Sequence, residues 1–301
     1  MRRSRSSTFW GYIAGIVTGA TYGMNPLFAK PMLENGVSVD TMLFFRYFLA
    51  VIIMGVWLII RRENLKIEWR HIPSIIIMGI TLGASGLFLF EAYKYMPSGP
   101  ATTIIYLYPV VVAIIMIFLK VYPKWQVWLS IILTFLGVAI LCKPEGEIQF
   151  DWRGIILSFC SAVSYAIFIV FNRNKQAKEL TSNALTFYVM LASSGLFMVH
   201  HLCIGDNFLK GTDNLSTWSE LIGLAIFPTI ISMVTLAVSI RLIGATKTSV
   251  LGVFEPLVAI LIGTVLFNEP FTWNIAIGIV ICISAIIFMA LTTSRLDIGQ
   301  D

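Results

Sequence analysis

The chain is built from apolar blocks about 20 residues long, separated by short stretches that carry charge, proline or polar clusters. Crossing roughly 30 Å of hydrocarbon requires a helix of about 20 residues. The types AVILMFWYC make up 57% of the 301 residues, and charged residues make up 12%, about half the share in a soluble domain. In water such a chain would expose too much apolar surface. The sequence predicts an all-α polytopic membrane protein and argues against a soluble enzyme, a disordered chain or a disulfide scaffold.

Ten apolar blocks are predicted to cross the bilayer as helices, at 10–29, 41–60, 72–93, 98–119, 125–142, 154–172, 183–203, 221–240, 248–267 and 273–293. The connections between them are short, so we expect no sizeable domain outside the membrane. The chain begins with basic residues followed by an apolar run, a pattern that resembles a signal peptide. We interpret it as a retained span, because it has no clear Ala-x-Ala site and has a counterpart in the second half of the chain.

Lysine and arginine are distributed unevenly over the two sides of these ten spans. Fifteen of the 21 basic residues fall on one side and five on the other, with Arg46 inside a span. Basic residues accumulate on the cytoplasmic side of a membrane protein, so both termini are predicted to be cytoplasmic. The same rule accounts for the net charge of +5. No basic stripe with interleaved aromatic residues occurs, and we expect no nucleic-acid partner.

Residues of the same kind recur at a nearly constant offset, which indicates an internal repeat. At an offset of 147 or 143 the matching pairs include Pro109 and Pro256, Pro123 and Pro270, Lys94 and Arg241, Gly11 and Gly154, Thr21 and Ser164, and Tyr22 and Tyr165. Five helices are an odd number, so the second half must enter the membrane from the opposite face. We therefore predict a tail at 1–9, inverted five-helix repeats at 10–147 and 148–294, and a tail at 295–301. Inverted repeats suit alternating access.

Several segments of the sequence match a known pattern: Tyr22-Gly23-Met24-Asn25, Arg46, the stretch from Phe90 to Tyr95, Ala101 to Pro109, Glu255-Pro256 and Asn268-Glu269-Pro270. From residue 10 to 293 the chain resembles the drug/metabolite transporter superfamily, specifically EamA-type permeases with ten helices in two repeats. Family patterns often place an acid after the fourth and the ninth helix. Glu269 fits, whereas the first half has Tyr122. The resemblance implies transport of small metabolites, often export of amino acids or related compounds.

Three ionisable residues, Arg46, Glu91 and Glu255, lie clearly inside the predicted spans. An ionisable group there costs several kcal/mol and is a functional candidate by default. Glu255 lies about eight residues into the ninth helix and precedes Pro256, which weakens the local backbone hydrogen bonding. It is a candidate proton carrier or a partner for a substrate ammonium group. The alternative is a protonated carboxyl group bonded to a neighbouring helix. Its counterpart in the first half is Tyr108, followed by Pro109.

Arg46 and Glu91 are predicted at comparable depth, which suggests either a buried ion pair that fixes helix packing or a site for a substrate carboxylate. Further polar groups at mid-depth could hydrogen-bond a ligand or a neighbouring helix; they belong to Tyr22, Asn25, Tyr106, Tyr108 and Tyr165. Glycines recur every fourth residue on one face of the first helix, at Gly11, Gly15, Gly19 and Gly23. Such a face allows close helix packing. It also suits a helix that slides or lines a cavity.

An enzymatic alternative rests on Gly83-Ala84-Ser85-Gly86, which matches a motif of intramembrane serine proteases. Such a serine needs a histidine beside it, and the three histidines, His71, His200 and His201, are predicted at helix ends. The sequence therefore argues against a hydrolase. It argues more strongly against a receptor or scaffold, because the loops are short. A passive channel is not excluded as an alternative. No P-loop is present, so the chain itself is not predicted to be an ATP-driven pump.

The prediction is thus a secondary transporter of small polar metabolites in the inner membrane, and not an enzyme. The four cysteines, Cys142, Cys160, Cys203 and Cys282, lie in or beside apolar blocks without a CxxC motif. They predict neither a metal site nor a disulfide framework, and no cofactor is expected. The expected partners are a small-molecule substrate, the lipid bilayer and, as candidate coupling ion, the proton. A monomer and a homodimer are both compatible with the sequence.

Overall fold

The computed structural model of the chain describes residues 5–63, 65–118, 125–141, 151–172, 180–204, 211–243, 248, 251–252 and 254–297. Within these ranges the regular elements are all helical. They are α1 (Arg5–Tyr22), α2 (Asn25–Glu34), α3 (Val39–Ile60), η1 (Trp69–His71), α4 (Ile72–Ala92), α5 (Ser98–Ile105), α6 (Tyr108–Phe118), α7 (Trp125–Leu141), α8 (Trp152–Asn172), α10 (Ser182–Ile204), α11 (Leu215–Ala225), η2 (Ile226–Ile231), α12 (Ser232–Ile243), α14 (Phe254–Phe267) and α15 (Trp273–Asp297).

Among the described residues, five helical stretches are long and apolar enough to cross a membrane: Val39–Ile60, Trp69–Ala92, Trp152–Phe171, Asn183–Cys203 and Leu215–Ser239. Four shorter apolar helical stretches accompany them, Ser98–Val112, Trp128–Leu141, Phe254–Phe267 and Trp273–Ala285. The outward side chains are apolar as well; on α3 they include Ile52, Val56 and Ile59. These findings confirm an all-helical protein suited to a lipid environment. The predicted junction at 147–148 and the outermost four residues of each predicted tail lie outside the described residues.

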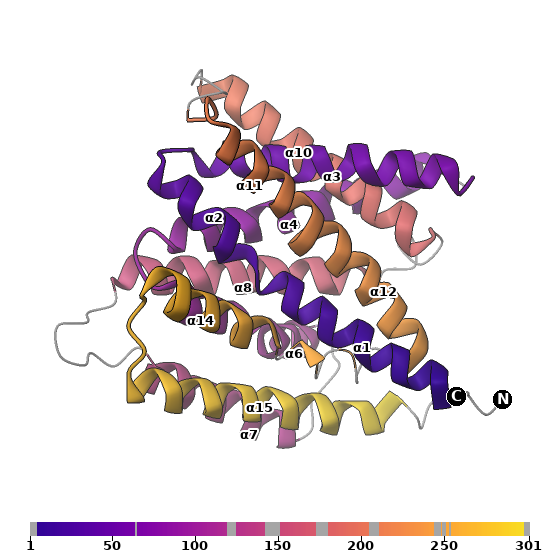
Figure 1. Ribbon diagram of the computed structural model, residues 1–301. Coiled ribbons are helices and arrows are strands. Elements are labelled where there is room, and N and C mark those ends of the chain that lie inside the picture. The colour runs from indigo at the N-terminus through magenta and orange to yellow at the C-terminus, as the bar shows by residue number, and fades with distance from the viewer. Residues whose placement is uncertain are drawn as a thin grey trace.

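Helices that are distant in sequence lie side by side, as Figure 1 shows. α1 packs along α12, α4 along α8, and α3 along α10, while α7 and α15 pair at one edge of the molecule. The largest buried cluster lies among α3, α4 and α10 and includes Met42, Leu43, Met78 and Met190. α1 begins and α15 ends on the same side of the molecule, at the right of Figure 1.

Where single long helices were predicted, prolines interrupt several of them. The span 10–29 is divided into α1 and α2 before Pro26, and the span 98–119 into α5 and α6 before Pro109. In the span predicted at 221–240 a π-helical turn, η2, contains Pro228 and separates α11 from α12. In the span 248–267, α14 begins only at Phe254, so Glu255 lies in its first turn and not eight residues inside. Proline has no N–H to donate to the carbonyl four residues earlier, which explains these breaks.

The carbonyl groups that three of these prolines leave free have other donors. The oxygen of Tyr22 accepts from Asn25 Nδ2 at 2.8 Å, and that of Leu224 accepts from Thr229 Oγ1 at 2.9 Å. The oxygen of Gly252 accepts from the N–H of Glu255 at 3.0 Å. Each interruption is therefore stabilised by a polar group close to it, as a backbone carbonyl inside a membrane requires.

The glycine face of α1 is a surface of close backbone approach. A Cβ atom at Gly11 would lie 2.5 Å from Ile243 Cγ2 on α12, and one at Gly19 would lie 2.9 Å from the carbonyl oxygen of Leu251. A Cβ at Gly23 would collide with the carbonyl oxygen of Glu255, and one at Gly15 with Leu251. The structure thus confirms close packing on this face, and whether α1 also slides stays a prediction.

The variant Gly19→Ala is expected to destabilise the protein by about 1–3 kcal/mol, because the added methyl group meets backbone atoms that cannot move away cheaply. The matched control is Gly195→Ala in α10, where a Cβ would meet no atom within 4 Å. Thermal unfolding of both variants in detergent measures the difference. Equal melting temperatures for the two variants would contradict the close contact.

Candidate functional site

A small cavity lies where the helix interruptions meet. Its six lining residues are Tyr22, Ile105, Tyr106, Tyr108, Tyr165 and Glu255. Four of them come from helix ends, because Tyr22 ends α1, Ile105 ends α5, Tyr108 begins α6 and Glu255 lies in the first turn of α14. Only Tyr165 comes from the middle of a continuous helix, α8. The structure therefore brings together five of the residues that the sequence singled out.

The tyrosine rings support one another through edge-to-face contacts. The rings of Tyr108 and Tyr165 have centroids 4.8 Å apart at an interplanar angle of 88°. Tyr106 and Tyr108 have centroids 5.8 Å apart at the same angle. Such pairs contribute about 0.5–1.5 kcal/mol beyond the burial of their surface. The wall opposite Glu255 is thus a fixed aromatic surface with phenol groups.

Glu255 is the acidic residue among those that line the cavity. Within the described part of the chain its carboxylate accepts no hydrogen bond, and its electrostatic partner is Arg46. A carboxylate in such a position favours either a proton or a cationic group beside it. The alternative, a protonated carboxyl group bonded to a neighbouring helix, stays a prediction.

Arg46 is buried, with 4% of its surface exposed, and it is not among the residues that line the cavity. Its Nε donates to Thr229 Oγ1 at 2.8 Å, and its Nη2 donates to the carbonyl oxygen of Pro228 at 3.4 Å. The guanidinium also faces the rings of Tyr22, Tyr47 and Phe90, with centroids 5.6–6.0 Å away. Oxygen acceptors in the π-turn and the faces of aromatic rings thus stabilise the charge of Arg46.

The expected pair between Arg46 and Glu91 does not form. Glu91 Oε1 instead lies 2.7 Å from Nζ of Lys94, three residues later, and both side chains are partly exposed. The physical reason is that Arg46 finds oxygen acceptors in the π-turn, which the sequence does not reveal, while Glu91 at the end of α4 reaches a nearer lysine. Glu91 therefore lies outside the cavity.

The remaining predicted residues lie around the cavity without lining it. Asn25 is 3% exposed; its Nδ2 donates to Tyr22, and its Oδ1 has no partner among the described residues. Pro256 is buried in α14 beside Glu255. The backbone of Pro109 belongs to α6, and its side chain lies outside the described part of the structure.

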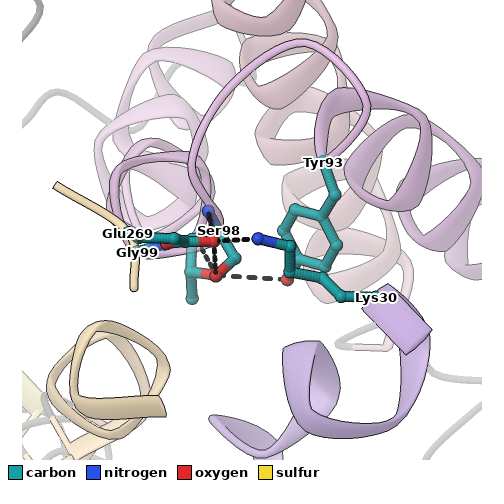
Figure 2. Close-up of polar contacts among 6 residues, drawn as sticks. Lys30, Tyr93, Ser98, Gly99 and Glu269 are labelled. Carbon is teal, nitrogen blue, oxygen red and sulfur yellow. Dashed lines mark hydrogen bonds and ion pairs between the residues drawn. The ribbon is translucent and has the colours of Figure 1, made fainter. Parts of the chain in front are cut away.

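A second polar cluster, which we call the Glu269 cluster, consists of Lys30 in the middle of α2, Ser98 and Gly99 at the start of α5, and Glu269 just after α14 (Figure 2). Glu269 was noted only for its match to the family pattern, and Lys30 and Ser98 were missed. A lysine near the end of the first span and an acid just after the ninth span were the available signals. Nothing in the sequence placed the two side by side.

Ser85 has a partner that does not suit hydrolysis. Its hydroxyl lies 3.1 Å from that of Ser161 on α8, and Ser161 Oγ donates to the carbonyl oxygen of Ser85 at 2.6 Å. His71 precedes Ser85 by fourteen residues along one continuous helical stretch, which at 1.5 Å per residue places them about 20 Å apart. The Ser85–Ser161 contact is a packing link between α4 and α8.

Known proteins share the sequence pattern and the fold of this chain. An uncharacterized transporter from Archaeoglobus fulgidus is 27% identical over 278 residues, which cover 90% of this chain and 91% of that protein. The uncharacterized inner membrane transporter YedA of Escherichia coli K12 is 22% identical over 275 residues, 88% of this chain and 85% of YedA. A solved crystal structure aligns with a TM-score of 0.66 at 19% identity, over 97% of this chain and 99% of that one, and shows the same fold.

The pattern of the EamA-like transporter family matches the chain twice, at residues 9–142 and again at residues 152–291. Together these two matches cover nearly all of the described helices. The resemblance noted in the sequence is thereby confirmed, and the chain belongs to the EamA-like transporter family.

Proposed function

We propose that this protein is a multi-pass secondary transporter that moves small polar metabolites by alternating access. Membership of the EamA-like transporter family supports this proposal, and so do the relatives that are named as transporters. The observation that carries the proposal is the tyrosine-lined cavity with Glu255, placed at helix interruptions. In secondary transporters, substrate and coupling-ion sites typically lie at such discontinuous helices near the bilayer midplane.

The proposal includes ten spans in two inverted repeats, and three observations support it. The family pattern matches each half separately. At the offset of 143, Tyr22 corresponds to Tyr165, and at the offset of 147, Tyr108 corresponds to Glu255; all four line one cavity. Contacts also correspond, since Gly11 packs on Ile243 and the equivalent pair, Gly154 and Met96, is in contact as well. A cavity lined by equivalent residues is the arrangement expected at an axis that relates two inverted repeats.

The chemistry of the cavity favours a substrate with an amino group. A carboxylate without a hydrogen-bond donor attracts an ammonium group, and tyrosine faces stabilise a cation through their π-electrons. Amino acids or related compounds, the class that the family resemblance implies, contain such a group. Glu255 would take up a proton when the substrate leaves, which makes it the coupling residue, and export is the proposed direction.

The variant Glu255→Gln is expected to lower transport driven by a pH gradient by about tenfold or more, because the amide can neither bind a proton nor carry a negative charge; tenfold corresponds to about 1.4 kcal/mol. The transport rate is measured as uptake into proteoliposomes with and without the pH gradient. A competition screen of amino acids, amines, nucleosides and sugars identifies the substrate. The control is Glu34→Gln, which makes the same change at an exposed position of α2.

Wild-type flux from well-folded Glu255→Gln would remove the coupling role and leave the transporter proposal standing. Flux that rises without saturation and shows no counterflow would identify a passive channel. Saturable flux with counterflow is the result expected for a carrier.

The orientation that we propose places both termini in the cytoplasm, following the distribution of lysine and arginine. It predicts that Lys66, in the loop between the second and third spans, and Lys175, in the loop between the sixth and seventh spans, face the same compartment. Cysteines introduced at either position into a cysteine-free background should react with a membrane-impermeant reagent from the cytoplasmic side. Reaction from opposite sides would contradict both the inverted repeat and the orientation.

A further inference from the structure

We propose that the Glu269 cluster is an ionic gate that holds one end of the transporter closed, and that the repeat-related position at the other end lacks the acid of this gate. The proposal rests on the alternating-access function. It adds to that function a specific closing device and a preferred resting state. In the orientation given above, the gated end is the extracytoplasmic one.

The carboxylate of Glu269 is the centre of the cluster, and 7% of its side chain is exposed. Oε1 lies 2.5 Å from Nζ of Lys30 and accepts from the backbone N–H of Ser98 at 2.9 Å and from its hydroxyl at 2.8 Å. Oε2 accepts from the N–H of Gly99 at 3.4 Å. Figure 2 shows these groups converging on the one carboxylate. It thus neutralises a lysine and binds the N-terminus of α5 at the same time.

The backbone around Glu269 is shaped to return this side chain to the bundle. Asn268 has a positive φ of 50°, which reverses the chain after α14. The N–H of Glu269 donates to the carbonyl oxygen of Gly263 at 2.9 Å. A Cβ at Gly263 would collide with Glu269 Oε2, so only glycine leaves the required space. The carboxylate is therefore held over α5 by its own segment.

The cluster joins the two halves of the chain above the cavity. Lys30 and Ser98 belong to the first half and Glu269 to the second. α5 and α14 each have one end at or beside the cavity and the other at the cluster, whereas α2 begins beside the cavity and carries Lys30 in its second turn. With 1.5 Å of rise per residue, the 14 residues of α14 span about 20 Å. Opening this end requires the halves to separate, and that requires the Lys30–Glu269 contact to break.

The energetic weight of this contact follows from its burial. Removing one member of a buried pair leaves an uncompensated charge and is strongly unfavourable. The Lys94–Glu91 pair has side chains that are 40% and 30% exposed and lies within one segment. Exposed pairs contribute little to stability. Lys94 is therefore a matched control, because it is a lysine bound to a glutamate that does not join the halves.

The internal repeat gives the gate a direction. By the repeat offsets of 143 and 147, the residue equivalent to Lys30 in the other half is Arg173, the one equivalent to Ser98 is Ala245, and the one equivalent to Glu269 is Tyr122. The basic residue is retained and the acid is lost; these three positions are compared by sequence alone, because they lie outside the described residues. The opposite end thus lacks the carboxylate on which an equivalent gate would depend. The resting equilibrium should favour closure at the Glu269 end.

The test measures access to the cavity from the gated side and needs no substrate. A single cysteine replaces Ile105 in a cysteine-free background, and a membrane-impermeant maleimide is added on the extracytoplasmic side. Glu269→Gln and Lys30→Met are each expected to raise the labelling rate about tenfold or more, while Lys30→Arg and Lys94→Met stay near the parent rate. Lys30→Met leaves the bonds between Glu269 and α5 intact, so folding should be retained.

Parent-rate labelling in both folded Glu269→Gln and folded Lys30→Met would overturn the gate. Lower melting temperatures without a change in labelling would also overturn it, since they would show a static link between helices. Rapid labelling of the parent protein from this side would do the same. If labelling contradicts the gate while the wild-type protein shows counterflow, the transporter proposal still holds. If labelling responds as expected but none of the screened compounds shows counterflow, only the proposed substrate class is in question.

Discussion

The constraint on which this structure depends is that a backbone carbonyl in hydrocarbon must have a hydrogen-bond donor. Four prolines remove such donors at Pro26, Pro109, Pro228 and Pro256. For three of the freed carbonyls the replacement donor is a side chain or N–H within a few residues. Polar groups are therefore concentrated where the helices are interrupted. The cavity lies at the same place, because irregular backbone inside a membrane is tolerated only where protein or a polar cavity surrounds it.

The buried charges of the protein are accommodated in three different ways. Arg46 receives oxygen acceptors from a π-turn and the faces of three aromatic rings. Glu269 receives a lysine and the N-terminus of a helix. Glu255 receives neither among the described residues, and it is the one that lines the cavity. The first two have interactions that hold helices together, which leaves Glu255 as the charge that is available to a ligand.

Much of this architecture could be predicted from the sequence, because long apolar blocks and repeated residues depend on composition and spacing. Glu255 was found because an ionisable residue inside an apolar block is rare, the tyrosines because their hydroxyl groups lie at mid-depth of such blocks, and the glycine face of α1 because its period of four is that of a helix surface. The failures share one cause. Proline signals a break, but not which donor replaces the missing one, so the π-turn that binds Arg46 was invisible and a pair with Glu91 was expected instead. Likewise, Lys30 and Glu269 are 239 residues apart, and no local pattern reports that contact.

The crossing of α1 over α14 has a consequence for how such a protein can diversify. The backbone of Glu255 rests directly on Gly23, where even a methyl group would not fit. The rings of Tyr108 on α6 and Tyr165 on α8 line the same cavity through their side chains. Under the proposed function, mutation can reshape these side chains one residue at a time while the acid keeps its place, so a lineage of this fold could acquire new cargo without rebuilding the part that holds the charge.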